Sequence, residues 1–227
     1  MTDKYTTEVL PEDFSQYDLS FKLIVIGDSG VGKSCLTMKA TKEHFEDFYS
    51  PTVGFEFFTF NVRVNNKNIK LQIWDTCGQE VYRSLISSFY RNSSLAVIVY
   101  AIDDINTFNN LESWLNEIKA QANPDIKIFL IGNKQDLESK RQVDKQKAEQ
   151  FKKEQNLNFF EETSAKTGFN AKNVFIEAAK VLYEEHLIYK DRASRPGSMN
   201  PIPFTPEIPN NLFLENPIER PKKKKCC

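Results

Sequence analysis

Short apolar runs alternate with longer amphipathic stretches from residue 21 onward. The apolar runs are FKLIVIG, FTFNVRV, IKLQIWD, LAVIVYAID, IKIFLIGNK and LNFFEETSA. Apolar residues at helical spacing follow Lys33 and recur in residues 108–121, 145–155 and 171–189. Strands that alternate with helices predict an α/β domain, with a mostly parallel sheet of six strands and helices on both faces.

One strand of this sheet should run against the others. The runs FTFNVRV and IKLQIWD are separated by only four residues, NNKN. A parallel connection needs a crossover of a dozen or more residues, whereas a short polar turn suits a hairpin. The sequence therefore predicts one antiparallel strand.

Composition divides the chain into three parts. Residues 20–190 carry the alternating pattern and form the predicted domain. Residues 1–19 are polar and acidic without a period, so we expect a loose extension whose role the sequence does not reveal. Residues 191–227 hold most of the ten prolines and end in PKKKKCC, which is typical of a solvated tether.

Charge and cysteine content exclude several classes of protein. Lysine and arginine total 30 against 31 acidic residues among 227, so nothing favours nucleic acid as the main partner. The four cysteines and the absence of a secretory signal pattern favour a reducing, cytosolic setting. No run approaches about 18 uninterrupted apolar residues, so we expect no membrane-spanning helix.

The stretch GDSGVGKS, from Gly27 to Ser34, fits the phosphate-loop pattern and lies between a strand and a helix. Its backbone amides and the start of the following helix suit a phosphate group. We expect Lys33 to bridge the terminal phosphates and the Ser34 hydroxyl to bind Mg²⁺. A glycine-rich turn that binds nothing is the alternative.

The stretch GNKQD, ending at Asp136, follows the strand IKIFLI and indicates which base is bound. A carboxylate there pairs with the ring N–H and the exocyclic amine of guanine, whereas adenine has an acceptor at that ring position. Sites built on paired donors reject such analogues by about 10⁴ or more. The stretch ETSAK follows the next strand and supports the same assignment.

The motifs GDSGVGKS, WDTCGQE, NKQD and ETSAK, in this order, resemble the Ras superfamily of small GTPases over most of the chain. VGFEFF, WDTCGQEVYRSL, FYRNS and the double-cysteine end resemble the Rab family of vesicle-traffic regulators. The resemblance implies a P-loop GTPase fold and a switch that hydrolyses GTP to GDP and phosphate with bound Mg²⁺.

The resemblance also implies roles for individual residues. Asp75 and Thr52 would join Ser34 in holding Mg²⁺, and Gly78 would offer its amide to the γ-phosphate. Phe45 would lie against the base, although an isolated phenylalanine is also an ordinary core residue. The full set of expected nucleotide contacts is Asp28, Ser29, Gly30, Val31, Gly32, Lys33, Ser34, Cys35, Phe45, Thr52, Gly78, Asn133, Lys134, Asp136, Ser164, Ala165 and Lys166.

Hydrolysis of the γ-phosphate needs a positioned water and charge neutralisation. We expect Gln79 to orient the attacking water. Lys33, Mg²⁺ and the loop amides should stabilise the negative charge that develops on the phosphate. No arginine is placed as an internal finger, so a GTPase-activating protein should supply that charge. A guanine nucleotide exchange factor, a GDP dissociation inhibitor or escort protein, and effectors that bind the switch regions complete the expected partners.

Two other classes remain open at this point. One is an interaction module that holds GTP or GDP with hardly any turnover, which Gln79 and Thr52 disfavour. The other is an ATP-dependent P-loop enzyme, which NKQD and ETSAK disfavour. Cys77 stands where relatives commonly carry alanine, and we consider both an inert small residue and a redox-sensitive thiol.

Aromatic and apolar side chains gather around the expected switch loops and form either an effector surface or part of the core. They are Phe55, Phe57, Trp74, Tyr82, Leu85 and Tyr90. At the end of the chain, Cys226 and Cys227 have no core to staple and lack further metal ligands. The Rab resemblance implies geranylgeranyl groups on both, at the cytoplasmic face of an intracellular membrane.

Overall fold

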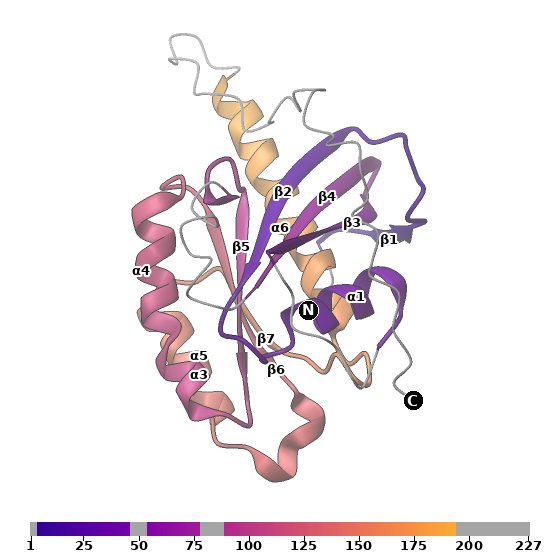
Figure 1. The fold of residues 1–227 in the computed structure, drawn as a ribbon. Coiled ribbons are helices and arrows are strands. Elements are labelled where there is room, and N and C mark those ends of the chain that lie inside the picture. The colour runs from indigo at the N-terminus through magenta and orange to yellow at the C-terminus, as the bar shows by residue number, and fades with distance from the viewer. Residues whose placement is uncertain (1–3, 46–53, 78–88, 194–227) are drawn as a thin grey trace.

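The computed structural model describes residues 4–45, 54–77 and 89–193, and these form one twisted sheet with helices on both faces (Figure 1). The sheet has seven strands in the order β1-β3-β4-β2-β5-β6-β7. Their bounds are β1 Thr7–Leu10, β2 Leu19–Ile26, β3 Phe55–Val64, β4 Lys67–Thr76, β5 Leu95–Ala101, β6 Lys127–Asn133 and β7 Phe159–Glu162.

Strand directions agree with the sequence prediction. β4, β2, β5, β6 and β7 are parallel neighbours, whereas β3 is antiparallel to both β4 and β1. All seven residues of β5 are buried, as a central strand covered on both faces requires. The α/β fold with one antiparallel strand is therefore confirmed.

The seventh strand, β1, was not expected. The sequence predicts a loose extension for residues 1–19, but Thr7–Leu10 pairs with the edge of β3. The Nδ2 atom of Asn61 then donates to the backbone oxygens of Pro11 and Glu12, at 2.9 and 3.0 Å. Four strand residues with only Val9 and Leu10 apolar give too short a pattern to recognise, yet the pairing covers part of an open sheet edge.

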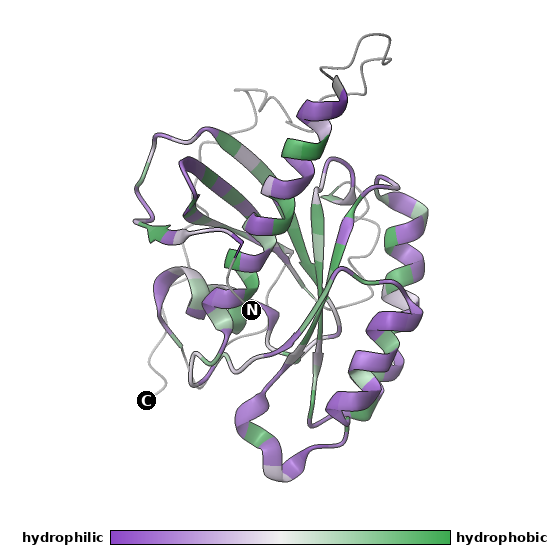
Figure 2. Ribbon diagram, turned by 180° about the vertical axis from the view of Figure 1, so that it is seen from behind, coloured by the Kyte–Doolittle hydropathy of each residue, from purple (hydrophilic) through white to green (hydrophobic). Residues whose placement is uncertain are grey.

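The helices divide the core into two layers. α1 (Lys33–Lys42) and α6 (Ala171–Ala193) pack on one face, and α3 (Ile105–Asn109), α4 (Leu111–Gln121) and α5 (Lys145–Glu154) pack on the other. A short 3₁₀ segment, η2 (Gln135–Lys140), lies between β6 and α5. Figure 2 shows apolar residues along the strands. The buried residues of α6 include Val174, Phe175, Ala178 and Leu182. None of the helices within the described ranges is long and apolar enough to cross a bilayer.

The parallel strands place the candidate site. β2, β5, β6 and β7 end at one edge of the sheet, and β4 ends there beside β2. The segments that follow β2, β6 and β7 are the phosphate loop, NKQD and TSAK. Ligands of open α/β sheets bind at this carboxyl edge.

Candidate nucleotide-binding site

The phosphate loop has the backbone that its glycines allow. Gly30 and Gly32 have φ of 77° and 92°, a region that other residues adopt at a cost. A Cβ atom on Gly32 would lie 2.4 Å from Nδ2 of Asn133, so the close approach of these two loops also requires glycine. Gly32 precedes the first residue of α1, and the amides of a first helical turn have no partner within the helix.

Lys33 folds back over this loop. Its Nζ atom donates to the backbone oxygens of Gly27 at 2.9 Å and Asp28 at 2.8 Å. Burial lowers the pKa of Lys33, and the negative charges of Asp75 and Asp28 oppose this effect. An ammonium held in this way is suited to neutralise a phosphate, because it is desolvated and fixed before the ligand arrives.

Ser34 and Asp75 form the candidate metal centre. The Ser34 hydroxyl donates to Oδ2 of Asp75, and the Oδ1 atom has no hydrogen-bond partner in the described part of the chain although it is buried. Burial raises the pKa of Asp75 to about 7. A hydroxyl and an unsatisfied carboxylate oxygen are the hard oxygen donors that Mg²⁺ prefers, so these residues fit the ion.

This centre offers few protein ligands. Among the residues that the structure describes, no group of three or more His, Cys, Asp or Glu side chains could hold a metal. Mg²⁺ keeps several waters and is commonly bound by one or two protein groups together with substrate phosphates. Ser34 and Asp75 therefore suit a metal that arrives with a nucleotide.

Asn133 joins the phosphate loop to the loop after β7. Its Nδ2 atom donates to the backbone oxygen of Val31 at 2.9 Å. Its Oδ1 atom accepts from the Thr163 hydroxyl at 3.1 Å and from the Ala165 amide at 3.2 Å. One buried side chain therefore sets the spacing between phosphate and base positions.

Asp136 and Ser164 lie together at the expected base position. The Ser164 hydroxyl donates to Oδ1 of Asp136 at 2.5 Å and accepts from the Thr167 amide at 3.1 Å. Asp136 is exposed while Ser164 is buried. The buried hydroxyl therefore holds a carboxylate that solvent can reach. Oδ1 is thus oriented by the protein, and the carboxylate is available to accept from a guanine edge.

The remaining predicted nucleotide contacts that the structure describes lie in α1, in the segment that follows it, and in the loops that follow β2, β6 and β7. Lys134 adopts a left-handed backbone, φ 69°, and its Nζ atom lies 3.5 Å from Asp103. Phe45 is half-buried and packs against the core layer of α1 and α6. Cys35 is half-buried in α1, while Ser29 and Lys166 are exposed.

Cys77 follows the last residue of β4 and lies two residues after Asp75 of the candidate metal centre. Its thiol is buried, and its amide donates to the backbone oxygen of Gly54 at 3.0 Å. This bond joins the segments that follow Thr52 and precede Gly78. The small buried side chain fits the inert interpretation, and redox reactivity stays an untested hypothesis.

Five of the predicted site residues lie outside the described ranges. They are Thr52, Gly78, Gln79, Cys226 and Cys227. Their roles therefore stay predictions from the sequence.

Sequence reasoning missed Arg141. Its guanidinium contacts both carboxylate oxygens of Glu162, at 2.7 and 2.9 Å, and also both of Glu138. Glu162 begins ETSAK and Glu138 follows NKQD, so Arg141 joins the two base-recognition loops. A lone arginine in a polar stretch gives no signal of this in the sequence.

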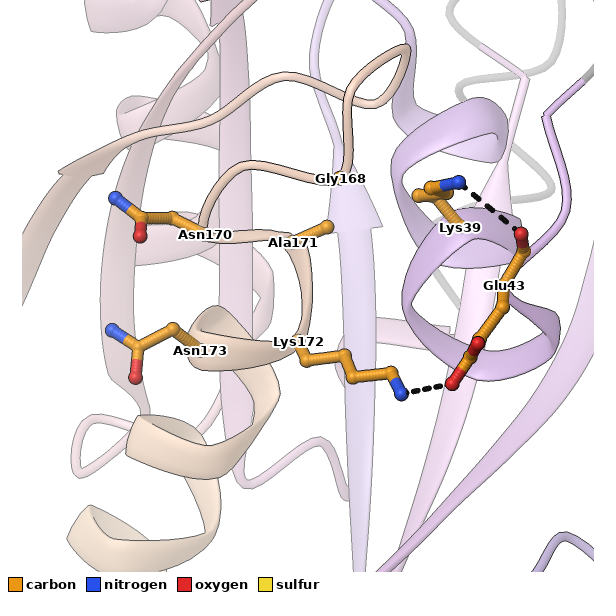
Figure 3. Close-up of a pocket in the computed structure, with 7 residues that line it drawn as sticks. All are labelled: Lys39, Glu43, Gly168, Asn170, Ala171, Lys172 and Asn173. Atoms are coloured by element: carbon orange, nitrogen blue, oxygen red, sulfur yellow. Dashed lines mark hydrogen bonds and ion pairs between the residues drawn. The ribbon is translucent and has the colours of Figure 1, made fainter.

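A hollow of about 300 Å³ lies behind these loops, between α1 and α6 (Figure 3). Lys172 forms an ion pair with Glu43, and Lys39 donates to the Glu43 backbone oxygen at 3.2 Å. Asn170 and Asn173 point away from these cations and bind Glu161. The ion pair between Glu43 and Lys172 therefore joins the end of α1 to the start of α6.

The geometry therefore combines an amide-lined loop, a buried lysine, an oxygen pair for Mg²⁺ and a base position with a presented carboxylate. The Ras family model matches residues 22–184. The chain belongs to the Ras family. Ras-family proteins are small GTP-binding switches that hydrolyse GTP, and they generally interact with exchange factors, activating proteins and effectors.

Membership in the Ras family accounts for the arrangement of the site. GTP or GDP with Mg²⁺ would be held by the residues just described, and the metal would supply charge neutralisation at the phosphates. An ATP-dependent enzyme is disfavoured, because the family match and the Asp136 geometry agree on guanine.

Proposed function

We propose that this protein is a Rab-type switch that is anchored to an intracellular membrane and regulates vesicle traffic through effectors of its GTP state. The observation that carries the proposal is an exposed aromatic patch, formed by Phe55, Phe57, Trp74 and Phe89. Phe55 and Phe57 are 43% and 49% exposed, which is unusual for side chains of this size. Exposed aromatic clusters are typical of protein interaction surfaces.

The patch is ordered by its own ring contacts. Trp74 lies 5.1 Å from Phe57, 5.4 Å from Phe55 and 4.9 Å from Phe89, measured between ring centroids. Phe57 and Trp74 are direct partners across β3 and β4. A rigid aromatic surface loses little entropy when a partner covers it, so it supports binding.

Three of the six residues that the sequence placed either on an effector surface or in the core, namely Phe55, Phe57 and Trp74, lie in the patch. Tyr90 is fully buried in the layer under α4, and its neighbour Phe89 joins Trp74 instead. Residues 89 and 90 are both helical, and the apolar pattern alone does not fix which of the two rings this segment turns outward. Tyr82 and Leu85 lie outside the described ranges.

The patch lies beside the segments that would sense the γ-phosphate. β3 begins three residues after Thr52, and β4 ends two residues before Gly78. If both contact the γ-phosphate, its loss releases both segments next to the aromatic rings. The patch would thus be read differently in the GTP and GDP states.

Hydrolysis in this proposal depends on positioning. Gln79 orients the water, while Lys33 and the phosphate-loop amides stabilise the developing charge. Slow unaided turnover and acceleration by a GTPase-activating protein follow, since no internal arginine is assigned to the reaction. A GDP dissociation inhibitor or escort protein would carry the lipid-modified GDP form through the cytosol.

The proposed anchor is two geranylgeranyl groups on Cys226 and Cys227. One lipid chain binds a membrane marginally, whereas two give stable anchoring. Lys222 to Lys225 would add about 1 kcal/mol each near an anionic leaflet, screened beyond a Debye length. The proline-rich tail would let the domain face its partners.

The deciding experiment combines intact-mass analysis with cell fractionation of the parent and of a Cys226→Ser/Cys227→Ser variant. The parent should carry two prenyl groups and sediment with membranes. The variant should be soluble and should bind GTP as the parent does, because the cysteines are remote from the site in sequence. A parent without prenyl mass, or a variant still on membranes, would refute the anchor. Imaging against organelle markers then identifies the compartment.

A further inference from the structure

Asp28 in the phosphate loop is bound by α4 through both oxygens of its carboxylate. The Trp114 Nε1 atom donates to Oδ1 at 2.8 Å, and the Asn110 Nδ2 atom donates to Oδ2 at 2.7 Å. Both donors are neutral, so they fix the position of the carboxylate without forming an ion pair with it. Trp114 is buried, which makes this contact part of the packed layer under the sheet.

Local structure makes both donors available. Asn110 lies between α3 and α4, and its side chain makes no capping bond to α4. By contrast, Asp104 caps α3 by accepting from the Asn106 amide at 2.9 Å. Trp114 follows Asn110 by four residues, so both side chains lie on one face of the helix start.

The same residue also directs Lys33. The Asp28 backbone oxygen accepts from Nζ of Lys33 at 2.8 Å. Moving the Asp28 side chain therefore moves the carbonyl that holds the phosphate-binding ammonium. The negative charge of Asp28 also favours the charged form of Lys33 against burial.

We propose that Asp28 is a positioning residue that couples α4 to the phosphate loop through Asn110 and Trp114, and thereby sets the rate of nucleotide release. The proposal rests on guanine nucleotide binding at this site. It assigns a role in retaining the nucleotide to Asn110 and Trp114, which are not among the expected nucleotide contacts.

The test exchanges the two polar partners. Asn110→Asp places two carboxylates against each other and should speed release of a fluorescent GDP about tenfold, the loss expected for one strong hydrogen bond. Asp28→Asn should change the rate only about twofold, because the Asn110 amide can turn its oxygen toward the new donor. The Asp28→Asn/Asn110→Asp double variant restores an amide facing a carboxylate and should return to within about threefold of the parent.

Asn106→Asp is the matched control. Asn106 is an exposed asparagine whose Nδ2 atom donates to Asp104 at 3.1 Å. The change therefore creates a similar pair of carboxylates near Asn110, but it leaves the contact between Asn110 and Asp28 intact. Release should be unchanged in this variant, even where its thermal stability falls. Comparison of release rate with thermal unfolding therefore separates positioning from general destabilisation.

Three outcomes are decisive. Fast release in Asn110→Asp that the double variant reverses supports the proposal. Parent-like release in Asn110→Asp, or a double variant as fast as Asn110→Asp, overturns it. A parent protein that fails to bind GDP would instead overturn nucleotide binding itself, so the two failures are distinguishable.

Discussion

Arg141 and Glu162 are joined by two parallel hydrogen bonds, and this pair holds the loop after β6 against the loop after β7. The distances are 2.7 Å from Nη1 to Oε1 and 2.9 Å from Nη2 to Oε2. The pair is largely shielded, because the side chains of Arg141 and Glu162 are only 16% and 8% exposed. A fork that matches a carboxylate in this way is specific to arginine.

Arg141→Met should therefore leave the Glu162 carboxylate without its main partner. We expect the free energy of unfolding to fall by about 2 kcal/mol, less than for a fully buried pair because Arg141 meets solvent beside Glu138. Release of GDP should also be faster, since Asp136 and Ser164 lie in the two joined loops. Urea unfolding at one fixed, saturating GDP concentration measures the first effect.

Glu138→Gln provides the control for this experiment. Glu138 contacts the same guanidinium but is exposed, so its loss should have a much smaller effect. Equal destabilisation by Arg141→Met and Glu138→Gln would contradict the assignment of the buried pair.

Asp136→Asn should change the base preference from guanine toward xanthine. The new amide donates a hydrogen bond where the carboxylate accepted one, and xanthine presents an oxygen at that position. The Ser164 hydroxyl is able to donate to the amide oxygen as it does to Oδ1, so the loop should keep its form. Competition binding with GTP, XTP and ATP tests this change, and an unaltered preference for GTP would show that Asp136 does not read the base.

The sequence predicted those parts of the molecule that can be recognised from one continuous stretch of residues. The phosphate loop and NKQD each follow a strand, and parallel strands bring their ends to one edge. The burial of Lys33 and the Asn133 bridge to Val31 follow from that arrangement. Long periodic segments such as α6 were predicted to within four residues, 171–189 against Ala171–Ala193.

Contacts between remote polar residues could not be predicted in this way. Asp28 and Trp114 are 86 positions apart, and neither residue type indicates the other. β1 was missed because strand pairing depends on the open edge of β3, which is a property of the folded sheet. Phe89 was missed, and Tyr90 stayed open between surface and core, because the sequence does not show which of two adjacent aromatic residues faces outward.

Gln79→Leu should lower the rate of GTP hydrolysis by at least about tenfold in the presence of an activating protein, with GTP affinity nearly unchanged. The residue is assigned to the attacking water and not to the bound phosphates, so only the transition state should lose an interaction. Single-turnover hydrolysis of bound GTP measures the effect. Ser34→Asn is the comparison, because loss of a Mg²⁺ ligand should weaken GTP binding and favour the diphosphate or empty state. Parent-like hydrolysis by Gln79→Leu would remove Gln79 from the mechanism.

Lys22 should make the stability of the domain depend on pH in the alkaline range. Its Nζ atom lies 5.4 Å from the ring centroid of Trp74 and 5.3 Å from that of Phe89, and it donates to the Arg91 backbone oxygen at 3.4 Å. Burial lowers the pKa of Lys22 from 10.5 to about 8. Between these two values the unfolded chain keeps a proton that the folded protein has lost, so the contribution of Lys22 to stability rises with pH across this window.

The measurement is the difference in unfolding free energy between the parent and Lys22→Met, from pH 7 to pH 10. This difference should be constant below about pH 8 and should then shift in favour of the parent, while other titrating groups cancel between the two proteins. Lys22→Arg is the control, because its guanidinium stays charged over this whole pH range. The difference in unfolding free energy between Lys22→Arg and Lys22→Met should therefore stay constant. A parent curve parallel to that of Lys22→Arg would mean that the ammonium beneath the aromatic patch is not desolvated, and that a partner covering Phe57 and Trp74 would meet a fully hydrated charge.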